Sequence, residues 1–344
     1  MSSTHNPRES PDVSFAGCGF LGIYHVGVAA CLKEHAPTLL DNNKVVGASA
    51  GALMAAAMVG GVPLPEMARS ILDLAERARR VAPVVISSAF KLDEAINESL
   101  QKLLPEDVHL RVSDRVYVAM TTIPEGKQLL ANKFSSRSEL ISALRASSYV
   151  PFIANWGFPR FRGHLVCDGI LSGIHPKRPA ATSTITVSPW AGRASISPSN
   201  TALFNRIQSF FFAGWPPSVE RIEKLCERGY EDAFKFLIDQ KHFSCDGCEY
   251  NDRKRCELDH PTVLSPEMKE VFEEAKKEEQ RGQDHRYMTK LQDAILRLAL
   301  IWLAPINSVQ SAVNAVTTIR LPSIETDVFG TPYHCMPLNV RPIS

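Results

Sequence analysis

The stretch Asn43–Val59 reads NKVVGASAGALMAAAMV: a short apolar run, a G-x-S-x-G motif and an alanine-rich segment. The run predicts a buried strand, and the Ala/Met segment predicts a buried helix over Ala50–Val59. A serine on a tight strand-to-helix turn is typical of a nucleophile elbow, where the crowded backbone leaves no room for a Cβ at the flanking positions. We therefore interpret Ser49 as a nucleophile and Gly47 and Gly51 as elbow glycines. The alternative is a small-residue turn that only packs a helix on a sheet.

A glycine loop lies upstream, in Val13–Leu32, VSFAGCGFLGIYHVGVAACL. Its G-x-G-x-x-G pattern also occurs in dinucleotide sites, where an acidic residue about 20 positions later holds the ribose. Asp41 has nearly this spacing, but it precedes the next predicted strand instead of ending it. The position of Asp41 therefore argues against a dinucleotide site.

Backbone N–H groups of such a loop, at the N-terminus of a helix, can stabilise an oxyanion instead of a phosphate. We expect this oxyanion hole to be formed by Gly17, Cys18, Gly19 and Gly22 if the first two strands are neighbours in the sheet. Cys18 would act through its amide. His25, on the following helix, is expected to be a packed or hydrogen-bonded residue without a role in the chemistry.

The serine needs a base. Late histidines are candidates, namely His164, His175, His242 and His260. A stronger candidate is Asp168 in VCDGILSG, because it ends an apolar run and has apolar neighbours that would raise its basicity by desolvation. The sequence thus favours a Ser49/Asp168 pair, while the alternative for Asp168 is a simple Asp-Gly turn.

Short apolar runs alternate with helical segments through the first half of the chain, which predicts an α/β domain with a mostly parallel sheet flanked by helices. Strands are expected at 12–16, 43–47, 115–121, 163–167 and 183–189, and helices at 22–35, 50–59 and 138–148, the last with a Ser cap. Residues 218–240 predict an amphipathic helical pair, 265–283 a charged helix or linker, and 288–319 further helices of a C-terminal extension.

The composition is that of an ordinary globular protein, with 344 residues, 44% of them hydrophobic, and a net charge of +1. This near-neutral balance argues against nucleic acid as a partner. The eight cysteines favour reduced thiols in the cytoplasm. The polar N-terminus does not resemble a secretory signal, and the apolar run 294–304 is too short to span a membrane.

These boundaries divide the chain into four parts. We expect a disordered lead-in at 1–11, a catalytic domain at 12–190, a loop and helical extension at 191–262, and a charged linker with a C-terminal helical region at 263–344.

Taken together, SFAGCGFLGIYHVGVAACLKEHAP, VVGASAGAL, FPRFRGHLVCDG, TITVSPWAG and WPPSVERIEKLCERGYEDAFKFL resemble the patatin-like phospholipase-domain family. The resemblance covers about residues 12 to 240 and is closest to the adipose triglyceride lipase and adiponutrin branch, insect relatives included. It implies a patatin-like fold, a Ser49/Asp168 catalytic dyad, the oxyanion hole named above, and no metal or organic cofactor.

The resemblance also implies a substrate and a location. Members hydrolyse long-chain acyl esters, chiefly triacylglycerol at lipid-droplet surfaces, and several act on phospholipids or retinyl esters or as transacylases. Lipolytic members are activated by an α/β-hydrolase-like co-activator protein. We expect a cytoplasmic, droplet-associated triacylglycerol lipase, with a phospholipase, an acyl-transferase or a droplet-binding pseudoenzyme as alternatives.

The chain departs from this family directly after the catalytic Asp-Gly. Ile170 stands where the family has Gly or Ala, and SGIHP replaces an acidic-Asn-Leu-Pro run. A β-branched residue would be strained there if the backbone had a positive φ. This departure motivates the pseudoenzyme alternative.

Further features lie toward the C-terminus. The cluster in CDGCEYNDRKRCELDH has the spacing of a structural zinc site or is a polar loop with incidental thiols; its candidate ligands are Cys245, Cys248, Cys256 and His260. The apolar group of Phe210–Phe212, Trp215 and Pro216–Pro217 would either insert into a lipid surface or close the core. The segment from Leu296 to Leu303 leaves the same two alternatives open.

Overall fold

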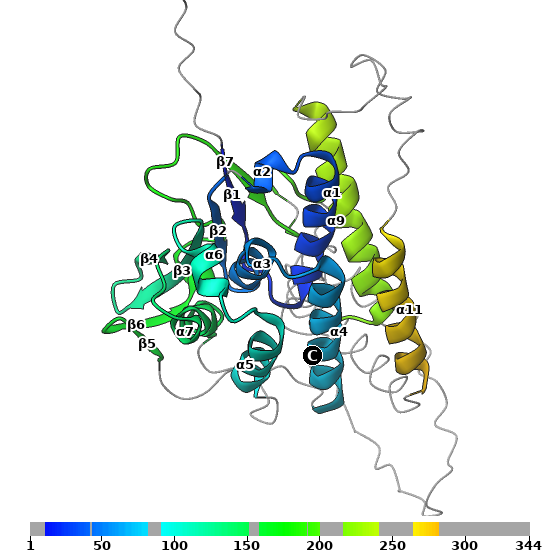
Figure 1. Cartoon of the computed structure of the whole chain (residues 1–344), viewed down its shortest axis with the longest axis horizontal. Coiled ribbons are helices and arrows are strands. Elements are labelled where there is room, and N and C mark those ends of the chain that lie inside the picture. Colours follow the sequence, from blue (N-terminus) through cyan, green and yellow to red (C-terminus); the bar gives the residue numbers. More distant parts are fainter. Residues whose placement is uncertain are drawn as a thin grey trace, which may run out of the picture. The chain divides into compact units, whose positions relative to one another are not determined.

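The computed structural model describes residues 11–41, 43–81, 91–150, 158–190, 192–199, 216–240 and 264–281. Within them, apolar segments form a seven-stranded sheet in the order β5-β6-β3-β2-β1-β7, with β4 also pairing β3 (Figure 1). The strands are β1 (Asp12–Phe15), β2 (Val45–Ala48), β3 (Val116–Ile123), β4 (Gln128–Ala131), β5 (Arg160–Phe161), β6 (His164–Asp168) and β7 (Thr184–Val187).

The sheet is mixed. The neighbours β7, β1, β2 and β3 run parallel, whereas β4 and β6 each pair antiparallel with β3, and β5 pairs antiparallel with β6. Every residue of β1 and β2 is buried. Strands covered on both faces lose the alternation of apolar and polar residues, which is why β2 reads as a continuous apolar run in the sequence. In β1 the buried Asp12 pairs with Arg178, and the Ser14 hydroxyl donates to the carbonyl oxygen of Pro176. The predicted α/β class with a mostly parallel sheet is confirmed.

The helices are α1 (Ile23–His35), α2 (Thr38–Asp41), α3 (Ala50–Val59), α4 (Leu64–Val81), α5 (Leu92–Leu103), α6 (Val108–Val112), α7 (Arg137–Ser147), α9 (Val219–Asp239) and α11 (Pro266–Arg281), with short 3-10 turns η1 (Gly19–Gly22) and η2 (Gly169–Ser172). The expected strands are all present. Two predictions need correction: 218–240 is one continuous helix instead of a pair, and α7 is capped by Ser136, whose side chain accepts from the amide of Glu139 at 3.1 Å.

Helices α1 and α9 approach so closely that glycine is required at the contact. A Cβ on Gly27 would lie 1.9 Å from the carbonyl oxygen of Cys226, and a Cβ on Gly229 would lie 2.2 Å from that of Tyr24. The buried Tyr24 hydroxyl donates to Asp232 at 2.9 Å. The later part of the chain therefore packs directly on the first helix of the sheet domain.

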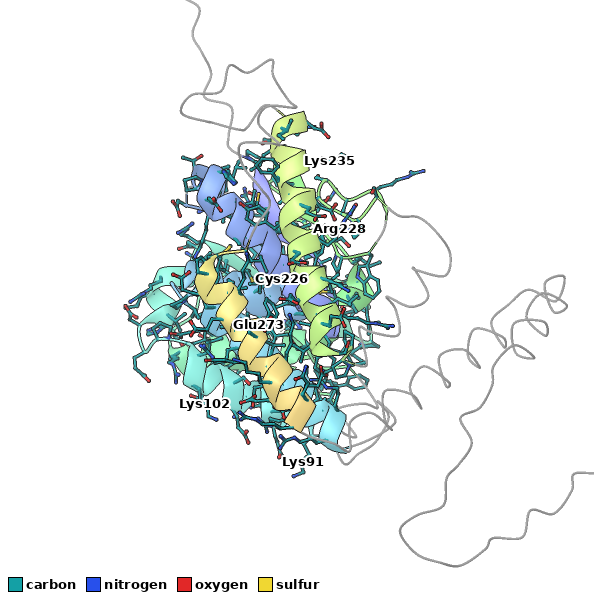
Figure 2. The ribbon with its side chains drawn as sticks, turned by 90° about the vertical axis from the view of Figure 1, so that its right-hand side faces the viewer. Lys91, Lys102, Cys226, Arg228, Lys235 and Glu273 are labelled. Carbon is teal, nitrogen blue, oxygen red and sulfur yellow. The ribbon has the colours of Figure 1, made fainter. Side chains whose placement is uncertain are left out.

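Helix α11 lies beside α9 (Figure 2) and also contacts α4. Its sequence is charge-dense, yet Met268, Val271 and Phe272 are buried. On the outer side, Lys276 forms an ion pair with Glu223 of α9 at 2.7 Å. Of the two alternatives for this segment, the structure therefore shows a helix with one packed apolar face.

Candidate active site

Ser49 lies on the turn between β2 and α3, with φ 52° and ψ −128°. This conformation is costly for a residue with a side chain and persists only where its surroundings enforce it. A Cβ on Gly47 would lie 2.4 Å from the carbonyl oxygen of Gly51, and a Cβ on Gly51 would lie 2.3 Å from that of Phe15. The G-x-S-x-G motif therefore has the strained, glycine-dependent backbone of a nucleophile elbow.

The strand β3 brings Asp168 to Ser49. Ala48, the last residue of β2, pairs with Ala119, and Asp168, the last residue of β6, pairs with Met120. Strand β4 pairs with one edge of β3 at both Ala119 and Met120. Strands β2 and β6 must therefore both lie along the other edge of β3, where they run toward each other. Their C-terminal ends meet there, so the residue after β2 and the last residue of β6 become neighbours.

The environment of Asp168 favours a carboxylate that accepts protons near neutral pH. The side chain is 2% exposed, and this burial raises its pKa from 3.8 to about 6. Hydrogen bonds from the Ile170 amide, at 2.9 Å, and from the Ser49 side chain oppose the rise. Burial dominates, as the apolar sequence around Asp168 predicts.

The glycine loop adjoins the Ser49 turn because β1 and β2 are neighbours. A Cβ on Gly17 would lie 3.3 Å from the Cβ atoms of both Ser49 and Ile170, which is a tight contact, so a side chain at this position would crowd both residues. Within the described part of the chain, no acceptor bonds the amides of Gly17, Cys18 or Gly19. The loop therefore presents backbone donors beside Ser49, while Gly22 packs against Ala50.

Two side chains hold this loop, the buried His25 and the half-buried Trp190. His25 contacts the carbonyl oxygen of Ala16 at 2.9 Å through Nε2, which must therefore donate, and Trp190 donates to the carbonyl oxygen of Gly17 at 3.0 Å. Burial lowers the pKa of His25 to about 4 and raises that of the Cys18 thiol far above its ordinary value. The side chains of His25 and Cys18 are therefore both neutral at pH 7, in line with the prediction that neither side chain takes part in the chemistry.

Ile170 does not have the positive φ that would strain a β-branched residue. Among the described non-glycine residues, positive φ occurs at Ser49, Asp114 and Arg162. Ile170 instead lies in η2, is half-buried, and donates a hydrogen bond from its amide to the carboxylate of Asp168. The expected source of strain is therefore absent.

An apolar cavity of about 190 Å³ opens from Ser49. Its walls come from the glycine loop and from α3, α4 and α5, and include Leu53, Met54, Ile71, Leu74, Ile96 and Leu103. Sequence analysis did not identify α4 or α5, although α4 has a strong helical periodicity of apolar residues. The side chain of Ser49 therefore borders a mainly apolar cavity.

The structure also contains site residues that sequence analysis did not single out. The Ser147 hydroxyl accepts from the Ser49 amide at 2.9 Å and donates to the carbonyl oxygen of Ala119 at 2.6 Å. The Asp168 amide donates to the carbonyl oxygen of Tyr149 at 2.8 Å. Residues 147–149 thus contact both members of the predicted pair, and the small polar residues at the end of the predicted helix were their only sequence signal.

Among the described residues, none of the other candidate side chains hydrogen-bonds Ser49 or Asp168. His164 is exposed on β6, His175 is half-buried, and Asp41 lies at the end of α2, before β2. His242, His260 and the other predicted zinc ligands, Cys245, Cys248 and Cys256, fall outside the described residues, as do Phe210–Phe212, Trp215 and the segment 296–303. Among the residues described, no three His, Cys, Asp or Glu side chains form a metal-binding group, and no helix has the length and apolarity needed to cross a membrane.

A sequence profile of the patatin-like phospholipases matches residues 13–180, the segment that holds the elbow, the glycine loop and Asp168. Residues 13–180 are a patatin-like phospholipase domain. Its curated relatives include patatin-like phospholipase domain-containing protein 2 of Rattus norvegicus, 36% identical over 248 residues, which are 67% of this chain and 52% of the relative.

Two more relatives of this patatin-like domain have similar sequence identity and coverage. The 1-acylglycerol-3-phosphate O-acyltransferase Pnpla3 of Mus musculus is 36% identical over 71% of this chain and 62% of its own length. Patatin-like phospholipase domain-containing protein 5 of Homo sapiens is 34% identical over 66% of this chain and 56% of its own length. The chain thus spans roughly half to three fifths of the curated relatives it matches. The structure of VipD from Legionella pneumophila, at 13% identity and a TM-score of 0.39, covers 90% of this chain and 79% of its own and is too distant for any conclusion.

Proposed function

We propose that this protein is a serine acyl-ester hydrolase whose preferred substrate is triacylglycerol. The observation that carries the proposal is the hydrogen bond between the Ser49 and Asp168 side chains, with Ser49 also lining an apolar cavity. The free amides of the glycine loop beside Ser49 support the same reading. A nucleophile, a base, oxyanion donors and a binding site for an alkyl chain are the parts that acyl-ester hydrolysis needs.

In the proposed reaction the acyl chain occupies the cavity, and the ester carbonyl oxygen accepts from amides of the glycine loop. Asp168 takes the proton of Ser49 as its oxygen bonds to the carbonyl carbon. Asp168 then gives this proton to the departing alkoxide, which leaves an acyl group on Ser49. Asp168 then takes a proton from water as the water oxygen bonds to the acyl carbon, and it returns this proton to the Ser49 oxygen as the bond between the acyl group and Ser49 breaks and the fatty acid leaves.

The choice of a long-chain substrate follows from the cavity, whose walls are mainly Leu, Ile and Met side chains. Triacylglycerol, the surface of a cytoplasmic lipid droplet and an α/β-hydrolase-like co-activator belong to the proposal through the family resemblance. A second candidate is acyl transfer, because relatives of the patatin-like domain include proteins named 1-acylglycerol-3-phosphate O-acyltransferase. Both reactions share the acyl-serine step and differ in the acceptor, water or an alcohol.

Release of fatty acid from emulsified triolein by the purified full chain tests the proposal. We expect wild type to be active and Ser49→Ala to be inactive with an unchanged fold. Retained turnover in Ser49→Ala would refute the mechanism. Adding 1-acylglycerol-3-phosphate to the assay separates the two candidates, because an acyltransferase converts it to the diacyl product at the expense of free fatty acid. An inert wild type that gains activity in Ile170→Gly would instead support the pseudoenzyme alternative.

A further inference from the structure

Three consecutive residues at the end of α7 face the predicted catalytic pair. Ser147 bonds the amide of Ser49, and Tyr149 bonds the amide of Asp168. Ser148 lies between them, and its own amide is satisfied by the carbonyl oxygens of Leu144 and Arg145, both at 3.1 Å. The backbone of Ser148 is thus held by the same segment that positions the nucleophile and the base.

The side chain of Ser148 differs from that of its neighbour. Ser147 uses its hydroxyl twice, as donor and as acceptor. The hydroxyl of Ser148 is also buried, with 8% of the residue exposed, yet it has no hydrogen-bond partner in the structure described. A buried polar group without a partner is rare in folded proteins and calls for an explanation.

The cavity supplies that explanation. Ser148 lines it together with Ser49, among mainly apolar side chains. None of the described groups in these walls bonds the Ser148 hydroxyl, so a polar group of a ligand that enters the cavity or its mouth would satisfy it. The polar group that accompanies an acyl chain to Ser49 is its ester.

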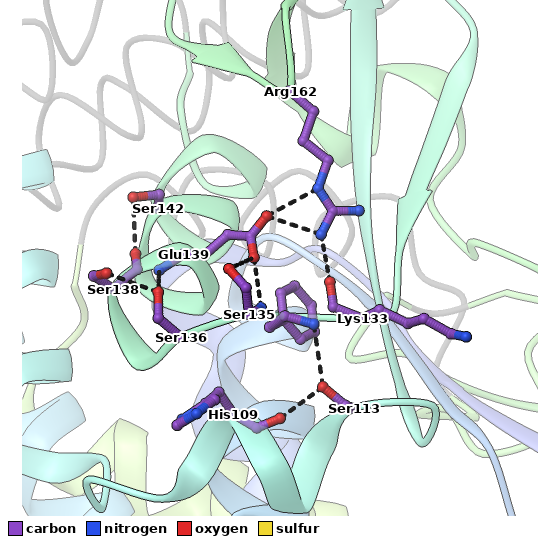
Figure 3. Close-up of polar contacts among 10 residues, drawn as sticks. His109, Ser113, Lys133, Ser135, Ser136, Ser138, Glu139, Ser142 and Arg162 are labelled. Atoms are coloured by element: carbon purple, nitrogen blue, oxygen red, sulfur yellow. Dashed lines mark hydrogen bonds and ion pairs between the residues drawn. The ribbon is translucent and has the colours of Figure 1, made fainter.

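Helix α7, which ends directly before Ser148, is anchored near both ends, and Figure 3 shows the contacts at its start. At its start, Glu139 accepts from the Ser135 amide and hydroxyl and pairs with Arg162 at 2.9 Å. Near its end, Arg145 makes a two-point ion pair with Asp93 of α5. A side chain on so fixed a helix end is preorganised, which is what a catalytic hydrogen bond requires.

We propose that the Ser148 hydroxyl donates a hydrogen bond to the bridging oxygen of the substrate ester. The inference rests on the proposed function, in which the carbonyl oxygen is already served by the glycine-loop amides. The bridging oxygen gains negative charge as its bond to the acyl carbon breaks. Ser148 stabilises that charge and keeps its own proton, while Asp168 delivers the proton taken from Ser49.

Single-turnover acylation of the full chain by two matched substrates tests this role. The substrates are a decanoyl oxoester and the decanoyl thioester of the same alkyl group, because a thioether-type sulfur is a poor acceptor. We expect Ser148→Ala to slow acylation by the oxoester about 10-fold to 100-fold, with little change in KM and a much smaller effect on the thioester. Ser148→Thr, which retains the hydroxyl, should recover most of the rate.

Ser142→Ala is the matched control. This serine lies on the same helix, is exposed, and bonds only the carbonyl oxygen of Ser138, so its loss should leave both rates unchanged. Labelling of Ser49 by a fluorophosphonate tests the proposed function separately. If wild type is labelled and hydrolyses the ester, but Ser148→Ala slows both substrates equally or neither, the role of Ser148 is refuted and the proposed function stands. If wild type neither reacts with the probe nor turns over, both proposals fail.

Discussion

Replacing Asp168 by asparagine is expected to abolish hydrolysis and, at neutral pH, to stabilise the fold. The carboxylate is 2% exposed, and burial raises its pKa from 3.8 to about 6. At about 1.4 kcal/mol for each pKa unit, holding the buried carboxylate ionised at pH 7 costs about 3 kcal/mol of folding free energy. Asparagine keeps an oxygen for the Ile170 amide but carries no charge, so it removes this cost.

The direction of the pH dependence follows from the same pKa. Below 3.8 the carboxyl group is protonated in both the folded and the unfolded chain, and the charge costs nothing. As the pH rises from 3.8 through about 6, the unfolded chain ionises first, and wild type loses stability relative to the variant. The advantage of Asp168→Asn should therefore be largest at about pH 7 and nearly absent at about pH 4.

Urea unfolding of wild type and Asp168→Asn at these two pH values measures the difference. Glu125→Gln, which removes one negative charge at an exposed turn, controls for net charge. In parallel, wild-type hydrolysis should rise with pH through about 6 as Asp168 loses its proton. A gain in stability that is equal at both pH values would refute the buried, ionised carboxylate. Full hydrolysis by Asp168→Asn would refute its role as the base.

Two further substitutions test the surroundings of the site. Gly229→Ala places a Cβ 2.2 Å from the carbonyl oxygen of Tyr24, so it should push α9 from α1 and cost about 1–3 kcal/mol of unfolding free energy, measured by urea; an unchanged midpoint would contradict the close approach. Ile71→Trp adds bulk to the wall of the cavity, so the ratio of kcat/KM for long-chain over butyryl p-nitrophenyl esters should fall at least about 10-fold. A proportional loss on both esters would show that the cavity does not hold the chain.

Much of the site could be predicted from the sequence because its parts are local. Gly47 is required by the close approach of Gly51, a near neighbour in sequence, whereas Gly51 is required by the carbonyl oxygen of Phe15 on the adjacent strand; the motif shows glycine at both positions. The glycine loop is also visible in the sequence, because it connects the strand β1 directly to the helix α1. Asp168 was recognisable because it ends an apolar strand and precedes a glycine that turns the chain.

Other features were decided by tertiary structure. Strands β2 and β6 both pair with the same edge of β3, and this brings together Ser49 and Asp168, which are more than a hundred residues apart in the sequence. No local pattern encodes the register of strands so far apart. The cavity walls come from α4 and α5, whose apolar faces read in sequence as ordinary core.

The Ser147 hydroxyl meets the Ser49 amide over a separation of 98 residues. The sequence by itself therefore determined which residues are candidates for the chemistry, since their residue types and positions at strand ends and glycine turns are visible locally. Only the tertiary structure decided which of them meet, and which hydroxyl, that of Ser148, is left facing the cavity, because burial and partners depend on the packing of distant segments.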